Sequence, residues 1–473
     1  MEKLFKLKEN GTTVRTEVLA GVTTFMTMAY IVALNPNLLT NFDTGSKLWN
    51  AVFCATLIST AVGTFCMAFL ANKPFVMSSG MGLNSFFATV VTQITAITGV
   101  SYTKGFQAAL VIILIEGTIF LLLSAFNVRE KIVEAIPLSI RIGISPAIGM
   151  MLLNIGLGSN AGIYSETGGP FYIMRDFFGS LTAGAAKTAM GSGWSTMVVS
   201  VITVFAGLIA IVVLDSKKIK GSVLFGMLIA SVFYWVCDFV FLGTNPFASL
   251  AEASWLPPIG DMVETTLFKF DFRTLADLGI TSVVTLIITF CIIDMFDTIG
   301  TLVGTASRAG MVDANGNMKN LKEALVSDAI GTISGGLTGT STITTFVESA
   351  SGVEAGGRTG LSSLTAGTLF LLCLFLAPLA AIIPAAATSS ALIYVGVLMI
   401  TGLRSLDFDN KQAMVPVLLM LIAMPISGSI GHAIGIAMIT DCFIRLFTGK
   451  AKEVSVLSWV ISGIFIVKFF IAI

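Results

Sequence analysis

Residues 135–157 read AIPLSIRIGISPAIGMMLLNIGL, an apolar stretch that holds one basic residue and two prolines. A second stretch, IIPAAATSSALIYVGVLMITGL at residues 382–403, shares three of its features. Both start with Ile-Pro, both carry a glycine twelve residues after that proline, and both end with Gly-Leu. Two related apolar stretches so far apart in the chain predict an internal repeat, as many membrane transporters have.

The composition of the whole chain is that of a membrane protein. Its 473 residues are 55% hydrophobic and only 11% charged, with a mean hydropathy of +0.92. Soluble domains carry about 25% charged residues, so this chain lacks the polar side chains to cover a water-facing surface. The N-terminus is polar and has no small-residue cleavage site, so we expect no signal peptide. The net charge of zero gives no indication of a nucleic-acid partner.

Apolar runs of about 20 residues, the length that spans a bilayer, recur along the chain. We expect an all-α membrane protein of fourteen spans in two groups of seven, with the two related stretches fifth in each group. Because seven is odd, the halves lie in opposite orientations, which makes an inverted repeat. The expected spans cover residues 16–36, 49–71, 76–97, 105–126, 137–157, 194–214, 220–242, 281–304, 323–338, 341–356, 361–383, 386–402, 412–428 and 430–447.

The predicted domain organisation follows from these spans. Residues 1–243 form the first repeat, 244–277 an extracellular linker, 278–447 the second repeat, and 448–473 a hydrophobic tail. With a cytoplasmic N-terminus, twenty basic residues fall on the cytoplasmic side and six on the outer side. This bias agrees with the positive-inside rule. The last apolar run, 454–473, either spans the membrane or lies at its interface, and the sequence does not decide between the two.

Metal and disulfide chemistry receive no support from the sequence. The six cysteines lie singly within apolar runs and form no CxxC motif. The chain has one histidine, which excludes His-cluster metal sites and His-based catalytic triads. We therefore expect neither a metal nor another cofactor.

The segment IIDMFDTIGT, residues 292–301, places two acids in a very apolar region. Asp294 and Asp297 are three residues apart, which puts both carboxylates on one face of a helix. An acid within a membrane span is functional by default. The alternative is a buried polar network that only holds helices together. Glu116 stands alone in mid-span, and the sequence leaves open whether it pairs with another helix or has a functional role, whereas Glu323 and Asp328 resemble a helix start.

Two further segments have the small and glycine residues of broken transmembrane helices. KPFVMSSGMGLNSFFATVV, residues 73–91, contains Asn84, and GGLTGTSTITTFVESASGVEAGGRTGL, residues 335–361, contains Glu348. Each predicts a short extended entry and then a helix, which starts near Thr344 or Thr345 in the second segment. Facing helix N-termini offer free N–H groups at the midplane, where inverted-repeat transporters bind their substrates.

Several motifs together resemble the AzgA-like purine permeases, the guanine, hypoxanthine and adenine branch of the nucleobase/ascorbate transporter superfamily. They are FKLKENGTTVRTEVLAGVTTFMTMAYIVALNP, GMGLNSFF, DMFDTIGTLVG, TTFVESASGVEAGGRTGL and IYVGVLM. The resemblance runs from about residue 4 to residue 450 in the expected order. It implies a seven-plus-seven inverted repeat with core and gate domains, purine–proton symport at the cell membrane, and homodimers as in related branches.

The resemblance also implies roles for individual residues. Asn84, Asp294, Asp297 and Glu348 match the binding positions, and Asp297 and Glu348 are candidates for proton coupling. Adenine-preferring members tend to have Asn at the position of Asp294, so Asp favours guanine and hypoxanthine. Ser85 departs from the family, which commonly has Ala after the Asn.

Three other functions remain to be weighed. An adenine-preferring permease differs only in the details of the site. An anion carrier of the same architecture would have a site free of acids, and three acids argue against it. An intramembrane aspartyl protease needs two aspartates on separate helices and usually a GxGD motif. Here both Asp294 and Asp297 lie on one helix, and the chain has no GxGD. We therefore expect a transporter and no enzyme.

Overall fold

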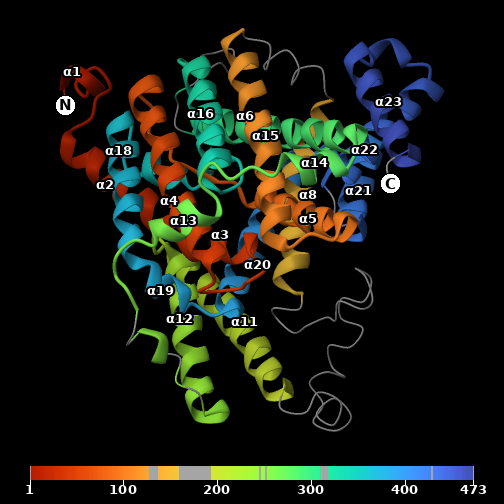
Figure 1. The fold of residues 1–473 in the computed structure, drawn as a ribbon. Helices are drawn as coiled ribbons and strands as arrows, with labels where there is room; N and C mark the ends of the chain where they lie inside the picture. Colours follow the sequence, from red (N-terminus) through yellow and green to blue (C-terminus); the bar gives the residue numbers. More distant parts are fainter. Residues whose placement is uncertain are drawn as a thin grey trace.

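The computed structural model describes residues 2–126, 137–158, 193–243, 245, 247–250, 253–308, 311, 318–427 and 430–471. These residues form a bundle of helices around a sheet of two short, fully buried strands (Figure 1). Apolar residues fill the interior between the helices and also cover much of the outside. Such an exterior suits lipid rather than water.

Eight helices in the described part of the chain are long and apolar enough to cross a membrane. They cover Val14–Leu39, Lys47–Ala71, Tyr102–Ala125, Leu138–Gly156, Trp194–Ser216, Ser222–Phe241, Gly360–Ala381 and Ala385–Ser405. Three shorter apolar helices cover Ile280–Met295, Lys411–Ile426 and Val456–Val467. All but Val456–Val467 fall on ranges where the sequence predicts a span. The total of fourteen spans stays a prediction.

The four other predicted spans coincide with shorter or broken elements. Two are plain helices, α16 (Leu321–Thr338) and α22 (Ile430–Phe447). The other two are a strand followed by a helix, β1 (Met77–Ser79) with α5 (Met81–Thr98) and β2 (Ile343–Thr345) with α17 (Ser349–Glu354). The extended entries predicted for these two segments are thus confirmed.

The helices pack into two groups. The first, here called the strand bundle, contains both strands with α2 (Val14–Met28), α3 (Ile31–Leu39), α4 (Lys47–Cys66), α5, α6 (Tyr102–Ala125), α15 (Ile280–Arg308), α16, α17 and α18 (Gly360–Leu372). The second bundle contains α8 (Leu138–Gly156), α11 (Gly193–Ser216), α12 (Ser222–Cys237), α20 (Ala385–Ile400), α21 (Lys411–Ser427) and α22. The two meet where α8 packs against α5 and α15, and also where α12 packs against α2.

Short helices accompany these bundles. The predicted linker at 244–277 holds α13 (Ile259–Thr265) and α14 (Phe272–Asp277), and α13 packs on α4. A surface ion pair of 2.8 Å between Lys47 and Glu264 joins these two helices. The remaining helices are α1 (Glu2–Phe5), α19 (Ala377–Ala381) and α23 (Val456–Ile471).

Glycines that occupy corresponding places in the two halves contact each other. Gly149 on α8 and Gly396 on α20 are the glycines twelve residues after Pro137 and Pro384. A Cβ atom on Gly149 would lie 2.5 Å from the carbonyl oxygen of Gly396, and one on Gly396 would lie 2.8 Å from that of Gly149. Reciprocal contacts of this kind are what a two-fold axis between related elements produces.

A second pair of helices shows the same reciprocity. Gly63 on α4 and Gly331 on α16 sit on the second predicted span of each half. A Cβ atom on either glycine would lie 3.3 Å from the Cα atom of the other. The absence of side chains at both positions lets α4 and α16 approach closely, as small residues do at helix interfaces in membranes.

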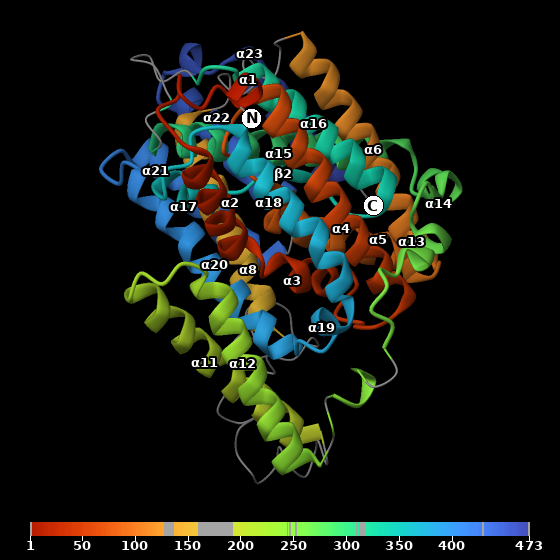
Figure 2. The same ribbon diagram turned by 90° about the vertical axis from the view of Figure 1, so that its left-hand side faces the viewer.

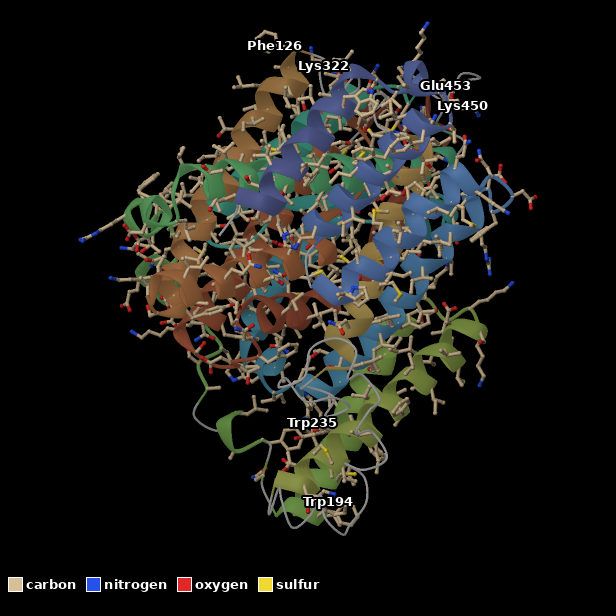
Figure 3. All side chains as sticks on the ribbon, turned by 90° about the vertical axis from the view of Figure 1, so that its right-hand side faces the viewer. Phe126, Trp194, Trp235, Lys322, Lys450 and Glu453 are labelled. Atoms are coloured by element: carbon tan, nitrogen blue, oxygen red, sulfur yellow. The ribbon has the colours of Figure 1, made fainter. Side chains whose placement is uncertain are left out.

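The lysines and tryptophans labelled in Figure 3 lie toward opposite ends of the molecule. Figure 3 shows Lys322 and Lys450 at one end and Trp194 and Trp235 at the opposite end. Large apolar side chains such as Val213 and Val236 are exposed on α11 and α12. Exposed apolar side chains on long helices are typical of a protein that lies in a bilayer.

Candidate functional site

The site is built around the two strands, which pair antiparallel inside the strand bundle. Met77 pairs with Thr345, Ser78 with Thr344, and Ser79 with Ile343. The predicted helix start near Thr344 or Thr345 is wrong, because these β-branched residues extend and pair with β1. Helix α17 begins only at Ser349, with Glu348 as its N-cap residue. Both α5 and α17 therefore start immediately beyond the sheet.

Helix α15 brings Asp297 to the start of α5. A Cβ atom on Gly80, the N-cap residue of α5, would lie 3.3 Å from Asp297 Oδ2 and 2.6 Å from the side chain of Thr344. The lack of a side chain at Gly80 thus makes room for the carboxylate. Asp297 is half-buried. Its carboxylate interacts electrostatically with those of Asp328 and Glu348, so the structure brings two of the predicted site acids, Asp297 and Glu348, together.

Glu348 is held by a tyrosine from the first predicted span. The hydroxyl of Tyr30 donates a 2.8 Å hydrogen bond to Glu348 Oε1. Tyr30 is fully buried in the short break between α2 and α3, whereas Glu348 is half-buried. Tyr30 was not among the site residues predicted from the sequence. The signal that was available is a hydroxyl in mid-span, close to the helix-disrupting Asn35 and Pro36.

The segment that carries Glu348 is also fixed at its far end. Glu17, buried on α2, accepts hydrogen bonds from the backbone N–H of Arg358 at 2.8 Å and of Thr359 at 3.3 Å, and from the hydroxyl of Ser362. These are groups at the start of α18, where a carboxylate also interacts well with the helix dipole. Figure 2 shows α2 beside α17 and α18.

Asn84 lies in the first turn of α5, and its side chain forms hydrogen bonds with three neighbouring residues. Its Nδ2 donates to Asn35 Oδ1 at 2.5 Å and to the carbonyl oxygen of Ser79 at 3.1 Å, while Oδ1 accepts from the hydroxyl of Ser341. Asn84 is 0% exposed. In this conformation the Asn84 side chain holds together the residues around the two strands. A ligand could contact it only if one of these hydrogen bonds breaks.

Asp294 is linked to Asp328 on α16 through a shared hydroxyl. The hydroxyl of Thr298 lies 3.1 Å from Asp294 Oδ1 and 2.9 Å from Asp328 Oδ1. The interpretation of Asp328 as part of a helix start is wrong, because α16 begins at Leu321 and Asp328 is fully buried two turns further on. Glu323 does lie in the first turn.

Glu116 finds a partner on the chain that leads into β2. The hydroxyl of Thr342 donates a 3.0 Å hydrogen bond to Glu116 Oε2, and both residues are fully buried. The partner seen here is a hydroxyl on the chain entering β2 and not a group on another helix. The strand β2 thus has a buried acid on α6 near one end and the acids of α15 and α16 near the other.

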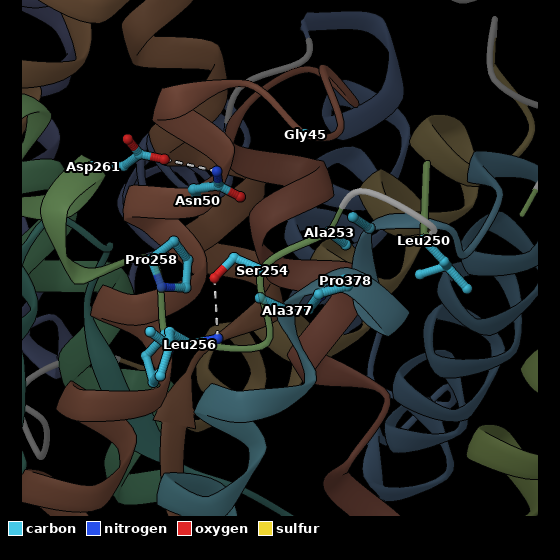
Figure 4. Close-up of a pocket in the computed structure, with 12 residues that line it drawn as sticks. Gly45, Asn50, Leu250, Ala253, Ser254, Leu256, Pro258, Asp261, Ala377 and Pro378 are labelled. Atoms are coloured by element: carbon cyan, nitrogen blue, oxygen red, sulfur yellow. Dashed lines mark hydrogen bonds between the residues drawn. The ribbon is translucent and has the colours of Figure 1, made fainter. Parts of the chain in front are cut away.

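A surface cavity of about 440 Å³ lies elsewhere, between the 244–277 linker, the start of α4 and α19 (Figure 4). Asn50 Nδ2 donates to Asp261 Oδ2 at its rim, at 2.7 Å. None of Asn84, Asp294, Asp297 and Glu348 is among its lining residues. Because the acids lie at the sheet instead, we take the sheet, and not this cavity, as the functional site.

Membrane helices that surround two buried strands, with acids beside the helix starts, define a membrane transporter. The sequence of residues 15–438 matches the family model of the xanthine/uracil permeases, which is described as the Permease family. The protein belongs to this family.

Characterised relatives share almost the full length of the chain. Adenine permease AdeP of Escherichia coli is 35% identical over 471 residues, which is 99% of this chain and 95% of that protein. Guanine/hypoxanthine permease PbuG of Bacillus subtilis is 33% identical over 475 residues, which is 99% of each chain. The predicted resemblance to purine permeases is confirmed.

A solved structure shares the fold. The transmembrane domain of a cyanobacterial bicarbonate transporter, BicA, superposes with a TM-score of 0.61 over 89% of this chain and 96% of that one. Its sequence is only 16% identical. At this identity the match describes the architecture and not the substrate.

Proposed function

We propose that the protein takes up purine nucleobases across the cell membrane by proton symport, with guanine and hypoxanthine preferred over adenine. The observation that carries this proposal is the placement of Asp297 and Glu348 beside the starts of α5 and α17. Both are half-buried, and each interacts electrostatically with the other. Inverted-repeat transporters bind substrates at such helix breaks.

A pair of carboxylates suits a purine. The base is flat, neutral and rich in N–H groups, and a carboxylate accepts hydrogen bonds from two adjacent N–H donors. Guanine presents N1–H beside its N2 amino group, which matches this acceptor. Adenine presents an acceptor at N1 beside a donor at N6, which matches it less well. The relatives include permeases for both bases, so the preference rests on the acids.

Asn84 and Asp294 are the more deeply buried members of the proposed site. Both are fully buried in this conformation, so their contact with a base requires the opening that alternating access supplies. Several buried acids close together favour binding of a proton to one of them, since like charges repel strongly away from water. Asp297 and Glu348 are the members of this group that an entering proton meets first.

The architecture that we propose is the fourteen-span inverted repeat with a cytoplasmic N-terminus. The reciprocal contacts of Gly149 with Gly396 and of Gly63 with Gly331 support the two-fold relation. The antiparallel pairing of β1 with β2 supports it as well. The position of Lys322 and Lys450 at one end of the molecule agrees with that orientation (Figure 3).

An anion carrier is the alternative that the shared fold raises. The fold of BicA accommodates bicarbonate, yet Asp297 and Glu348 would repel an anion at the corresponding helix starts. The acids therefore favour a neutral substrate rich in hydrogen-bond donors.

Proton coupling predicts which gradient drives uptake. Purified protein in liposomes should accumulate labelled hypoxanthine when the inside is alkaline, and an uncoupler should abolish the accumulation. A sodium gradient alone should have no effect. Accumulation that follows sodium and persists without a proton gradient would exclude symport with protons.

The base preference is tested at Asp294. An Asp294→Asn change replaces one acceptor oxygen by an N–H₂ donor, so guanine loses a charge-assisted bond of about 1.5–3 kcal/mol, which is about ten- to a hundredfold in affinity. Adenine should lose less, because the amide pairs with its alternating donor and acceptor. Competition by unlabelled guanine and adenine against labelled hypoxanthine, in both proteins, measures the two changes. Equal weakening of both competitors would remove Asp294 from base recognition.

A further inference from the structure

The hydroxyl of Thr298 on α15 sits at the meeting point of three other oxygen atoms. Asp294 Oδ1, from the same helix, lies at 3.1 Å, and Asp328 Oδ1, from α16, lies at 2.9 Å. The hydroxyl of Thr344, on β2, lies at 2.8 Å. All four residues are at most 1% exposed, so bulk water does not solvate this cluster.

Counting hydrogen atoms limits how this cluster is protonated. Thr298 has one hydrogen to donate and two lone pairs that accept. It can therefore donate to only one of the two aspartates. If both aspartates were ionised, the other carboxylate would face a lone pair of Thr298 at about 3 Å with no hydrogen between them. A buried contact of that kind is repulsive.

One added proton satisfies every contact. A protonated Asp328 donates to Thr298, Thr344 donates to the second lone pair, and Thr298 donates its own hydrogen to the ionised Asp294. The mirror arrangement, with the proton on Asp294, is equally complete. Two buried acids that share one proton are a known solution to like-charge repulsion, and the proton belongs to the pair.

We propose that Asp294 and Asp328 hold a single proton between them through Thr298, and that this is the proton that moves with the purine. The inference rests on the proposed symport function and assigns its proton. Transfer from Asp328 to Asp294 moves one hydrogen onto Thr298 Oγ1 and one off it. During this internal transfer the pair keeps one proton and one negative charge, and no other reactant is needed.

The position of the pair links it to the base. Asp294 precedes Asp297 by one helical turn on α15, and Asp328 interacts electrostatically with Asp297. The other acids that face this region are Glu348 beside α17 and Glu116, which is bonded to Thr342 on the chain entering β2. A proton on the pair lowers the negative charge around Asp297, so proton binding and base binding become thermodynamically linked.

The test separates proton coupling from base exchange. Thr298→Val removes the bridging hydroxyl at nearly constant shape, Asp328→Asn removes one acid, and Thr298→Ser keeps the hydroxyl as the matched control. Each variant is placed in liposomes and assayed for hypoxanthine counterflow, for accumulation driven by a proton gradient, and for hypoxanthine-induced proton entry with an internal pH dye. The first two variants should keep counterflow but lose accumulation and proton entry by about ten- to a hundredfold. Thr298→Ser should behave as the unmodified protein.

Each unfavourable result has a distinct meaning. If Asp328→Asn accumulates hypoxanthine with normal proton entry, the pair does not carry the proton, while symport stands. If the unmodified protein shows no hypoxanthine-dependent proton entry, the proposed function itself fails. For a variant that does not fold, infrared spectroscopy of the unmodified protein decides. A shared proton requires the carbonyl band of a protonated buried carboxyl in the unmodified protein, and absence of this band would overturn the proposal.

Discussion

Replacement of Glu348 or Asp297 by alanine is expected to abolish purine uptake while the protein still reaches the membrane. Hypoxanthine carries two N–H groups, so each carboxylate is proposed to accept one of them, and each charge-assisted hydrogen bond is worth about 1.5–3 kcal/mol. Loss of one bond weakens binding by about ten- to a hundredfold. Labelled hypoxanthine uptake, normalised to the amount of protein in the membrane, measures the effect.

Glu354 provides the matched control for this experiment. It is an acid at the other end of the same helix, α17, and its side chain is 68% exposed in a surface ion pair with Lys220. Surface ion pairs contribute about 0–1 kcal/mol, so Glu354→Ala should leave uptake nearly unchanged. Near-normal uptake in Glu348→Ala or in Asp297→Ala would remove that residue from the site. Loss of uptake in Glu354→Ala would show that α17 tolerates no change at all.

The second large effect is expected at the crossing of α8 and α20. In most helices a Gly→Ala change stabilises by about 0.5–1 kcal/mol, because alanine loses less conformational freedom on folding. At Gly149 the new Cβ atom would lie 2.5 Å from the carbonyl oxygen of Gly396, so the two helices must separate. Overpacking of this kind costs about 1–3 kcal/mol and sometimes more. Gly149→Ala should therefore lower the thermal stability of the purified protein. The direction of this change is what tests the close helix contact, because Gly→Ala raises stability in most helices.

Gly402, in the short 3-10 helix Thr401–Ser405 that follows α20, serves as the control. A Cβ atom there would lie 3.5 Å from the ring of Pro146, which is an ordinary contact. Gly402→Ala should be neutral or slightly stabilising in the same thermal measurement. Gly149→Ala that is as stable as the unmodified protein would show that α8 and α20 do not cross at this distance.

The sequence is most informative about features set by local composition. Runs of about 20 apolar residues predict where the long helices lie, and the glycine and threonine content around Gly80 and Thr344 predicts the extended entries. Asp297 and Glu348 are conspicuous as acids in apolar surroundings. The helix start near Thr344 was misplaced because strand pairing with β1, which lies more than 250 residues away, overrides the local pattern.

The partners of the site residues could not be predicted. Tyr30 and Glu348 are 318 residues apart, and no local pattern connects them. Asp328 looks like a helix-start acid, because Asp is common in a first turn and burial depends on which face meets α15. Asn84 stands out as a polar residue, yet its bonds to Asn35 and Ser341 depend on how three separate segments pack.

The two bonds that α2 makes with the Glu348 segment have a mechanical consequence. Glu17 fixes the start of α18, and Tyr30 holds Glu348, at points thirteen residues or about 20 Å apart along a helix. A helix attached at both ends transmits force without bending much, so α2 and residues 348–362 translate and rotate as one body. Glu348 cannot change its depth in the bilayer without displacing the whole of α2. Any motion that carries a base across the membrane therefore moves α2 along α12, on which it also packs, as well as α5 and α15 along α8.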